Sequence, residues 1–433
     1  MVNTSLKYKN LILIGLVGLL FAPLIESTTK IKYVKKLEGA VWEKDTVPKF
    51  TFKNWFNGDF QRQQEVLVSD SFGFRNIFVR INNQVDFSLF SKAHAKDVVI
   101  GKDNYLYDKH YINGYLGTDF IGSDSVSNVV ARLKFINDTL SKLNKTLILV
   151  IAPNKAAYYP EYIPDSFKTR NSTTTYGEFV KQLKQADLKY IDFNSYFIAQ
   201  KNKSKYLLMP KNGTHWSMYG AAIAGDSILH YIEKVRNIKM PELSLTYTTP
   251  GKDSLFDIDI ENAMNLLFNL SGPSMEYPRY KYINASTNIK PNVLIVGDSY
   301  YWGLDAAINL KNCFTDRSDF WYYFKKLEHK NLTQQDVKEK IAGEDIVIIL
   351  ATAHNWGDIG WGFIETTYNM FKGIAPNQKH TAEFTARLDE LVKYIKTDKN
   401  WLSAITKDAH EKGISVDSAI VVNAIWTIEH DKK

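Results

Sequence analysis

Short apolar runs alternate with amphipathic stretches through the middle of the chain. Strand-like runs lie at 145–154, 189–193, 291–296, 320–324 and 344–350. Between them, apolar residues recur with the three-to-four spacing of helices at 130–144, 177–188, 215–235 and 332–342. Wholly apolar strands separated by helices are typical of a parallel sheet covered on both faces. The pattern therefore predicts an α/β fold with a doubly wound, mostly parallel sheet.

The flanks of this region have different patterns. A helical period runs through 59–90, and two β-rich segments around Gly101–Asn104 predict a hairpin within 97–108. Beyond about residue 376 the strand signals stop and the pattern is helical. We therefore predict a signal anchor (1–28), a tether with an N-terminal helical segment (29–95), an α/β domain (96–375) and a C-terminal helical extension (376–433).

The N-terminus carries an uncharged apolar run, Leu11 to Ile25, which follows Lys7 and Lys9. The run is short for a membrane span and also resembles the core of a signal peptide. Because no small-x-small cleavage site follows, we favour an uncleaved anchor in the cell membrane. The remainder of the chain is then exported to the periplasm or another extracytoplasmic space. A cleaved signal and an interfacial helix are the alternatives.

Charge and cysteine content exclude several classes of protein. The net charge of +7 is spread over many lysines and glutamates, which argues against a nucleic-acid-binding surface. Cys313 is the single cysteine, so the chain has no intrachain disulfide and no thiolate cluster for a metal. No metal-binding motif is present, and we predict neither a metal nor another cofactor.

A candidate nucleophile stands at the end of the segment "VLIVGDS". Ser299 follows an apolar strand, and a helix begins at Tyr300. In doubly wound sheets, ligands gather at the carboxyl ends of the strands. A helix beginning there offers backbone N–H groups and partial positive charge beside the hydroxyl. The alternative is an ordinary strand-to-helix turn with a serine in it.

A candidate base precedes Ser299 in the chain. His215 lies in the loop "KNGTHWS", just before a long amphipathic helix. A helix N-terminus disfavours the imidazolium and keeps a neutral base available. A histidine that only bonds a loop carbonyl is the alternative.

Five segments together carry a resemblance to a known family. In order they are "FQRQQEVLVSDSFGFR", "VVIGKDNYLY", "VIAPNKAAYYPEYIP", "THWSMYGA" and "VLIVGDSYY", between about residues 59 and 304. The set resembles the alginate O-acetyltransferase family with an SGNH-hydrolase-like domain. The resemblance implies acetyl transfer with Ser299 as nucleophile and His215 as general base. It further implies that the N–H of Ser299 or Tyr300 supports the oxyanion.

The same resemblance implies a setting for the enzyme. Family members are membrane-tethered and exported, and they work on a polysaccharide acceptor with a membrane-bound O-acyltransferase as the acetyl supplier. Transfer to a sugar and hydrolysis by water share the acyl-enzyme, so a polysaccharide O-acetylesterase is an alternative.

One position departs from the family pattern. The family has Asp-x-His-Trp, and Gly213 stands where its aspartate orients the imidazole. Three outcomes are open: another acid takes over, either Asp298 or one from a later loop; a backbone carbonyl orients the ring; or the site is crippled. The amide oxygen of Asn212 is a further candidate for the ring N–H. A crippled site leaves a polysaccharide-binding or assembly subunit, with the C-terminal helices docking a membrane partner.

Three other residues are candidates for substrate binding. Lys155 follows a strand end, where it either meets an anionic sugar or pairs with a carboxylate. Trp216 either stacks on a sugar ring or packs beneath the following helix. Asn355, with His354, follows another strand end and is expected either to line the same cleft or to be ordinary loop.

Overall fold

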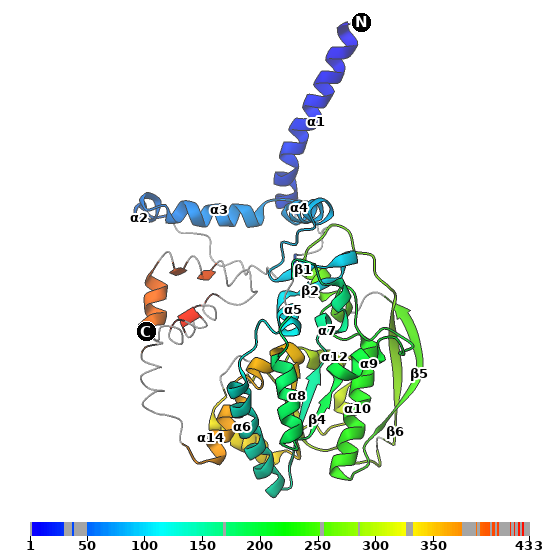
Figure 1. The fold of residues 1–433 in the computed structure, drawn as a ribbon. Helices are drawn as coiled ribbons and strands as arrows, with labels where there is room; N and C mark the ends of the chain where they lie inside the picture. Colours follow the sequence, from blue (N-terminus) through cyan, green and yellow to red (C-terminus); the bar gives the residue numbers. More distant parts are fainter. Residues whose placement is uncertain are drawn as a thin grey trace. The chain divides into compact units, whose positions relative to one another are not determined.

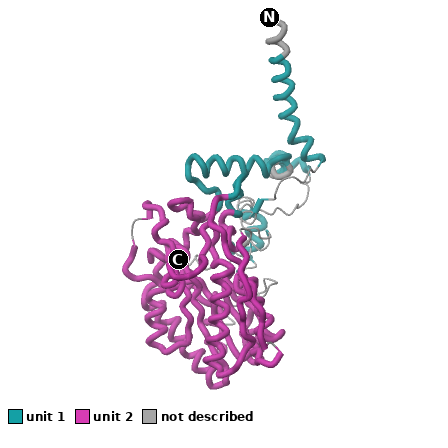
Figure 2. Tube along the Cα trace, turned by 90° about the vertical axis from the view of Figure 1, so that its right-hand side faces the viewer, with its two compact units in different colours: residues 1–95, 262–269, 382–433 teal, residues 96–261, 270–381 magenta. Residues whose placement is uncertain are grey.

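A computed structural model describes residues 2–29, 37–38, 50–167, 170–251, 255–284, 286–325 and 332–374, with scattered positions between 387 and 427. The chain divides into two compact units (Figure 2). Unit 1 comprises residues 1–95, 262–269 and 382–433, and unit 2 comprises residues 96–261 and 270–381.

A five-stranded parallel sheet is the centre of unit 2 (Figure 1). Its strand order is β4-β3-β9-β7-β8, with every neighbouring pair parallel. The strands are β3 (Thr146–Ala152), β4 (Tyr190–Asp192), β7 (Val293–Gly297), β8 (Asp319–Tyr322) and β9 (Ile346–Thr352). The predicted parallel α/β fold is confirmed, because all five strand-like runs of the sequence contribute to one sheet.

Helices cover both faces of this sheet, as the alternation of side chains along the strands requires. Along β3, Ile148 and Val150 belong to one buried cluster, and Leu147 and Leu149 belong to the other. The first face is covered by α5 (Lys109–Leu116), α7 (Lys155–Tyr158), α9 (Phe193–Gln200), α10 (Met218–Arg236) and α12 (Tyr300–Ile308). The second is covered by α6 (Ser123–Lys142), α8 (Thr175–Gln185), α13 (Gln334–Gly343) and α14 (Phe363–Phe371).

Two antiparallel pairs lie outside the main sheet. β1 (Val98–Ile100) and β2 (Leu106–Asp108) form the predicted hairpin. β5 (Glu242–Gly251) and β6 (Met275–Ile283) form a long ribbon that the sequence pattern did not predict. The ribbon encloses an excursion that contains a 3-10 turn (Leu255–Asp257) and α11 (Asp259–Ala263). Further 3-10 turns are Lys102–Asn104, Pro160–Tyr162, Leu310–Asn312 and Ala353–Asp358.

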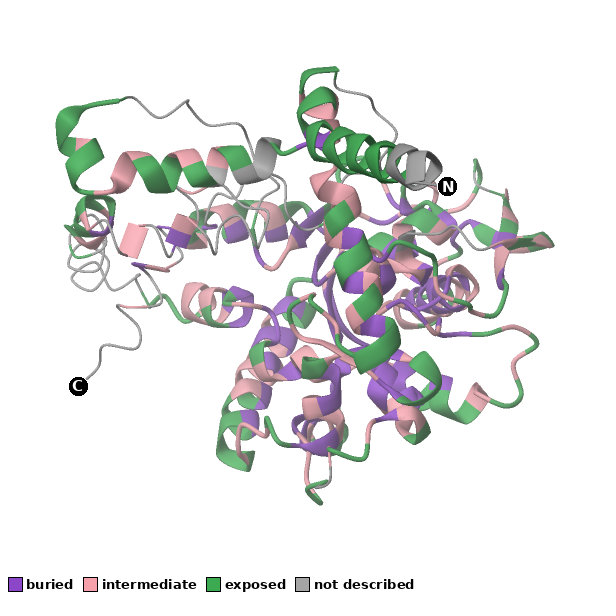
Figure 3. Ribbon diagram, turned by 90° about the horizontal axis from the view of Figure 1, so that it is seen from above, coloured by how far each residue is buried: buried purple, intermediate pink, exposed green. Residues whose placement is uncertain are grey.

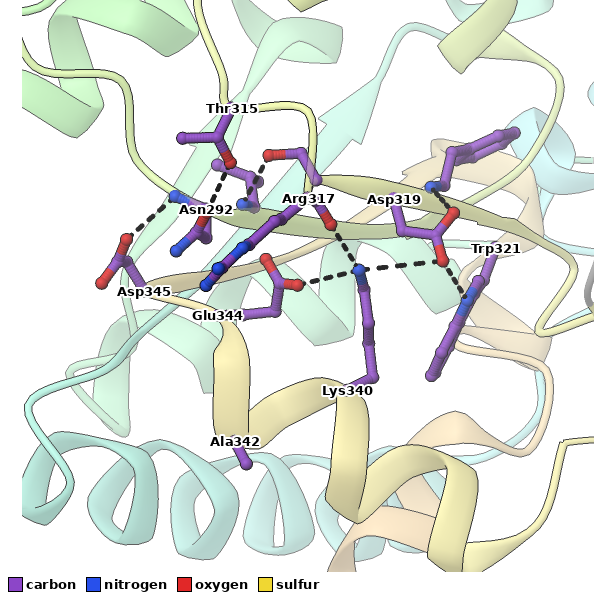
Figure 4. A network of polar contacts seen from close by, with 12 residues as sticks. Asn292, Thr315, Arg317, Asp319, Trp321, Lys340, Ala342, Glu344 and Asp345 are labelled. Atoms are coloured by element: carbon purple, nitrogen blue, oxygen red, sulfur yellow. Dashed lines mark hydrogen bonds and ion pairs between the residues drawn. The ribbon is translucent and has the colours of Figure 1, made fainter.

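The amino end of the sheet is closed by a polar network (Figure 4). Lys340 Nζ donates to Arg317 O at 2.6 Å and lies 2.9 Å from Glu344 Oε1. Asn292 N donates to Asp345 Oδ2 at 2.9 Å. Glu344 is buried, and this burial raises the pKa of its carboxyl. The network ties α13 to the starts of β7, β8 and β9.

Unit 1 contains an N-terminal helix, α1 (Val2–Thr29), which is long and apolar enough between Tyr8 and Thr29 to cross a membrane. Residues 8–21 of this helix are exposed (Figure 3), whereas Pro23 is buried. Three helices follow: α2 (Phe52–Phe56), α3 (Asp59–Ser71) and α4 (Arg75–Phe90). The helical period of 59–90 is thus divided in two, because Phe74 adopts a left-handed conformation that a helix interior excludes.

The predicted boundaries at 28, 95 and 375 stay predictions. Most of the predicted tether and of the C-terminal extension lies outside the described residues. In the extension, four described residues are buried together: Ile395, Ile405, Ile420 and Ala424.

Candidate active site

Ser299 stands at the carboxyl end of a central strand. β7 ends at Gly297, and Ser299 occupies the N-cap position of α12 with backbone angles of −64° and −13°. Its neighbours in the sheet, β9 and β8, end at the same edge. The hydroxyl is therefore carried on a rigid junction between a buried strand and a helix.

The imidazole of His215 reaches this hydroxyl. His215 Nε2 lies 2.8 Å from Ser299 Oγ, although 84 positions separate the two residues in the chain. The His215 side chain is 13% exposed, and its ring packs between the rings of Phe256 and Tyr300. The two loops singled out in the sequence therefore meet at one place.

The carboxylate behind the imidazole belongs to Asp259, at the start of α11. Its Oδ2 lies 2.6 Å from His215 Nδ1. Its Oδ1 accepts from Thr214 N at 2.6 Å and from Ile260 N at 2.9 Å. Since a carboxylate only accepts, Nδ1 carries the ring proton and Nε2 is left to accept from the Ser299 hydroxyl.

Gly213 explains why the acid comes from this distant segment. A Cβ at residue 213 would stand 2.3 Å from the carbonyl oxygen of Phe256 and 2.7 Å from the carbonyl carbon of Asp257. The segment that supplies Asp259 thus fills the space that a side chain at 213 would need. An aspartate at 213 and this placement of residues 256–259 exclude each other.

Asp298 is not the orienting acid, which corrects one of our candidates. Its carboxylate is buried and points to the end of β9. Oδ2 accepts from Thr352 N at 2.7 Å, from Thr352 Oγ1 at 2.6 Å and from Asn355 Nδ2 at 3.1 Å. Oδ1 accepts from Tyr300 N at 3.1 Å. The carboxylate thus joins the ends of β7 and β9 and fixes the turn that carries Ser299.

Asn212 does not hold the imidazole either. Its side-chain Nδ2 donates to Glu261 Oε2 at 2.8 Å, and its backbone carbonyl oxygen accepts from Glu261 N at 3.2 Å. Glu261 Oε1 in turn accepts from Leu270 N at 2.8 Å. Because Glu261 lies two residues after Asp259, this pair of bonds holds the acid-bearing segment against the His215 loop.

Comparisons with known proteins bear on the same part of the chain. Residues 98–303 match the family described as "SGNH hydrolase-like domain, acetyltransferase AlgX". The match runs from β1 to the start of α12 and includes His215 and Ser299.

Several curated relatives carry the name "Probable alginate O-acetylase AlgJ". The protein of Pseudomonas syringae is 26% identical over 172 residues, which are 40% of this chain and 42% of the relative. That of Pseudomonas putida is 23% identical over 210 residues, 48% of this chain and 52% of the relative. The chain thus spans about half the length of the curated relatives it matches.

Among solved structures, the O-acetyltransferase domain of Pseudomonas putida AlgJ aligns with a TM-score of 0.39 at 19% identity, covering 63% of this chain and 98% of that one. Bacillus cereus PatB1 with a sulfonyl adduct aligns with a TM-score of 0.40 at 13% identity, covering 56% and 93%. Similarities this loose assign no residue a role.

Lys155 lies beneath the His215 loop. Its side chain is buried, and Nζ donates to Lys211 O at 2.7 Å and to Gly213 O at 2.6 Å. Burial lowers the pKa of the ammonium to about 7, against the attraction of Asp259. The expected alternatives, a sugar contact or a carboxylate pair, are wrong because both close acceptors are backbone carbonyls.

Trp216 is fully buried, so it is unavailable to stack on a sugar. Its ring packs against Phe193, Phe197 and Tyr300 beneath α10. The Tyr300 hydroxyl lies 2.8 Å from Thr214 O and 3.0 Å from Pro153 O. These aromatic residues support the His215 loop from below.

Asn355 and His354 follow β9, as expected. The Asn355 amide donates to the buried Asp298 carboxylate at 3.1 Å. The His354 ring packs on Tyr111 with ring centroids 3.9 Å apart, and burial lowers its pKa to about 3. His354 is therefore neutral at physiological pH. Asn355 helps to hold the Asp298 carboxylate behind Ser299.

The oxyanion donors differ from the expectation in one respect. Tyr300 N is engaged by Asp298 Oδ1, which removes it as a donor to substrate. Among the described residues none accepts a hydrogen bond from Ser299 N. The N–H of Ser299 is accordingly the available donor beside its own hydroxyl.

Sequence reasoning missed Asp259. It lies in "LFDIDIENA", where Asp257, Asp259 and Glu261 alternate within a region to which no element had been assigned. Three acids at alternate positions beside an unassigned stretch were the available signal. In the described part of the chain, no group of three or more His, Cys, Asp or Glu residues is placed to hold a metal ion.

Proposed function

We propose that this chain is an exported, membrane-anchored O-acetyltransferase that transfers acetyl groups to polysaccharide hydroxyls through an acetyl ester on Ser299. The observation that carries the proposal is the row of contacts from Ser299 Oγ to His215 and from His215 to Asp259. Relatives named alginate O-acetylases support the reaction and the polysaccharide substrate.

In the first half-reaction, Ser299 Oγ attacks the carbonyl carbon of an acetyl donor. His215 Nε2 takes the hydroxyl proton, and Asp259 stabilises the imidazolium that forms. The negative oxygen of the tetrahedral intermediate accepts from Ser299 N. The bond to the leaving group then breaks, the leaving group takes the proton from Nε2, and the acetyl group remains on Ser299.

In the second half-reaction, a sugar hydroxyl attacks the acetyl-serine. His215 removes the proton from that hydroxyl and returns it to Ser299 Oγ as the ester bond to the enzyme breaks. If water takes the place of the sugar, the same steps release acetate. Transfer requires that the acceptor reach the intermediate before water does.

The proposed polysaccharide substrate and the apolar helix α1 support a reaction at the membrane surface. We propose that α1 is retained as the anchor, with the catalytic domain on the outer side. A membrane-bound O-acyltransferase that delivers acetyl groups is the proposed donor system. The rival role, a degenerate binding subunit, rested on Gly213, and Asp259 now supplies a carboxylate at the imidazole.

The proposal is tested by incubating the full chain with p-nitrophenyl acetate, with and without an oligosaccharide acceptor. We expect mass spectrometry to detect an acetyl group on Ser299 and acetylated oligosaccharide as product. Ser299→Ala should lose both signals. The matched control, Ser127→Ala, changes an exposed serine on α6 and should keep both.

Two results would contradict the proposal. If Ser299→Ala forms as much product as the parent, an acetyl ester on Ser299 is excluded as the intermediate. Acetate release that no acceptor alters would mean hydrolysis and would exclude transfer.

A further inference from the structure

The helix α4 of unit 1 has its polar and apolar faces reversed relative to a helix in a soluble protein. Its buried side carries Arg80 and Asn83, with Phe87 between them and the helix end. Arg80 Nη1 donates to Leu266 O and Asn83 Nδ2 to Met264 O, each at 2.9 Å. The polar face is thus fastened to residues 262–269 of the same unit.

The opposite face of α4 is exposed and apolar. Phe78, Ile81, Val85 and Leu89 recur at spacings of three and four and lie on one side of the helix, with exposures between 40% and 71%. Asn82 and Ser88, the exposed polar residues between them, are uncharged. We call Phe78, Ile81, Val85 and Leu89 the α4 stripe. An uncharged apolar stripe of this kind is unusual on a surface that faces water.

Exposed apolar residues are also found in α2, which α3 joins to α4, and at Phe50 just before α2. Phe50, Phe52, Trp55 and Phe56 are all exposed, and Phe56 reaches 83%. The ring of Phe50 contacts the rings of Phe52 and Trp55, so these three aromatic side chains form one surface cluster. Aromatic residues, tryptophan above all, are enriched at the boundary between lipid and water.

Contacts within unit 1 place the turn before α4 at the end of the apolar helix α1. A Cβ at Gly73 would stand 1.8 Å from the carbonyl oxygen of Pro23, so the two backbones touch. Phe74 N donates to Glu26 Oε2 at 3.2 Å. Pro23 precedes the end of the apolar span at Thr29 by about 9 Å of helix, at 1.5 Å per residue.

We propose that α4 lies in the interface of a lipid bilayer, with the α4 stripe facing the acyl chains. The inference rests on the proposed anchoring of α1. The span Tyr8–Thr29 is about 33 Å long, close to the thickness of a bilayer's apolar core. A turn bound to Pro23 and Glu26 then stands at the edge of that core, and α4 begins there.

The depth agrees with that of known interfacial helices. Such helices bury their apolar face by about 5–10 Å at the boundary of headgroups and acyl chains. The polar side of α4 meanwhile keeps its hydrogen bonds to residues 262–269. The helix thus contacts lipid on one side and protein on the other, which accounts for its reversed faces.

The test uses the full chain in phosphatidylcholine–phosphatidylglycerol vesicles that contain doxyl-labelled lipids. An environment-sensitive fluorophore is attached at one of three single sites: Val85→Cys, Leu16→Cys on α1, or Ser125→Cys on the exposed side of α6. Cys313 is buried and its thiol pKa is raised to about 11, so the parent chain serves as the unlabelled blank.

We expect the lipid quenchers to remove most of the fluorescence at residues 16 and 85 and to leave residue 125 unaffected. Quenching at 16 without quenching at 85 would overturn the interfacial helix while leaving the anchor in place. Quenching at neither would overturn the anchor, and the inference with it. A blue-shifted but unquenched probe at 85 would mean that protein covers the stripe, which also overturns the inference.

Turnover of p-nitrophenyl acetate by each labelled chain reports separately on the proposed chemistry. A chain that turns over the ester but shows no quenching at 85 refutes only the interfacial helix. Quenching at 85 in a chain without ester turnover refutes only the catalytic proposal.

Discussion

The two ends of the central sheet each hold a lysine that donates to backbone carbonyls, yet the lysines differ in what surrounds them. Lys340, at the amino end, also lies 2.9 Å from the buried Glu344 carboxylate. Lys155, at the carboxyl end, is itself fully buried, and it donates hydrogen bonds to two carbonyls of the His215 loop. One lysine neutralises a charge, while the other holds a loop.

This difference shows how the domain separates stability from chemistry. Polar groups at the amino end bond to one another and join strands to α13 (Figure 4). At the carboxyl end, Asp298, Lys155 and Asn212 bond to the backbone or to residues behind the site, and Ser299 and His215 stay partly accessible. Substitutions at the two ends should therefore separate in kinetic and thermal measurements.

The largest effect is expected at Asp259. Asp259→Asn should lower kcat by about 10⁴-fold, because an amide allows the wrong imidazole tautomer. The matched control is Asp257→Asn in the same segment, which should keep kcat near the parent value. Steady-state turnover of an acetyl ester measures both. Equal losses in the two variants would mean that the segment is merely structural.

The pH dependence of stability offers a second test, through the buried carboxyl of Asp257. Burial raises the pKa of Asp257 to about 6, and its described partner is the Tyr277 hydroxyl at 2.5 Å. A raised carboxyl pKa stabilises the fold at low pH, and this stabilisation is lost as pH rises from about 4 through 6. The loss amounts to about 3 kcal/mol at 1.36 kcal/mol per unit.

Asp257→Asn should abolish this loss, so the variant should gain stability over the parent at pH 8 relative to pH 4. Urea unfolding at the two pH values measures the difference. Identical pH dependence in parent and variant would show that Asp257 does not titrate in this range.

Lys155→Met comes next. The substitution removes the donor to two carbonyls of the His215 loop, and a displacement of about 1 Å at the base costs about 10²-fold in rate. We expect kcat to fall and KM to change little, because Lys155 is buried away from substrate. Lys155→Arg keeps a positively charged donor in a larger side chain and so controls for a change of shape alone. A change confined to KM would instead indicate direct contact with the substrate.

The smallest effect on catalysis is expected at the other lysine. Lys340→Met leaves Glu344 without its cation and should reduce the free energy of unfolding by roughly 1–3 kcal/mol. Its kcat should match that of the parent at a temperature where both are folded. Thermal unfolding and ester turnover on the same sample compare the two. A large fall in kcat would show that the amino end of the sheet also affects catalysis.

The sequence predicted the sheet because β3, β7 and β9 are apolar and buried on both faces and the strands alternate with amphipathic helices. It also indicated Ser299 and His215, since each stands where an element begins or ends. It did not predict the β5–β6 ribbon, whose strands mix exposed and half-buried positions and include Pro250 and Pro278. The partner of His215 was missed for this reason.

The sequence could not decide between the alternatives for the candidate substrate-binding residues, for a different reason. Lys155 and Trp216 are residue types that serve equally well in a site or beneath one, and burial decides between these roles. Burial depends on how loops pack at the sheet edge, which periodicity does not encode. The same packing decides which of several acids reaches the imidazole.

The pairing of Gly251 with Met275 brings the two ends of the excursion between β5 and β6 side by side. The segment between them, which carries Asp259, therefore begins and ends at the same point of the ribbon. Replacing this segment would leave the order and direction of every strand unchanged, although it would remove the carbonyls of Met264 and Leu266 that hold α4. The proposed orienting acid is accordingly carried on a segment that can vary separately from the sheet, while Ser299 and His215 lie beside the helices α12 and α10 that pack on it.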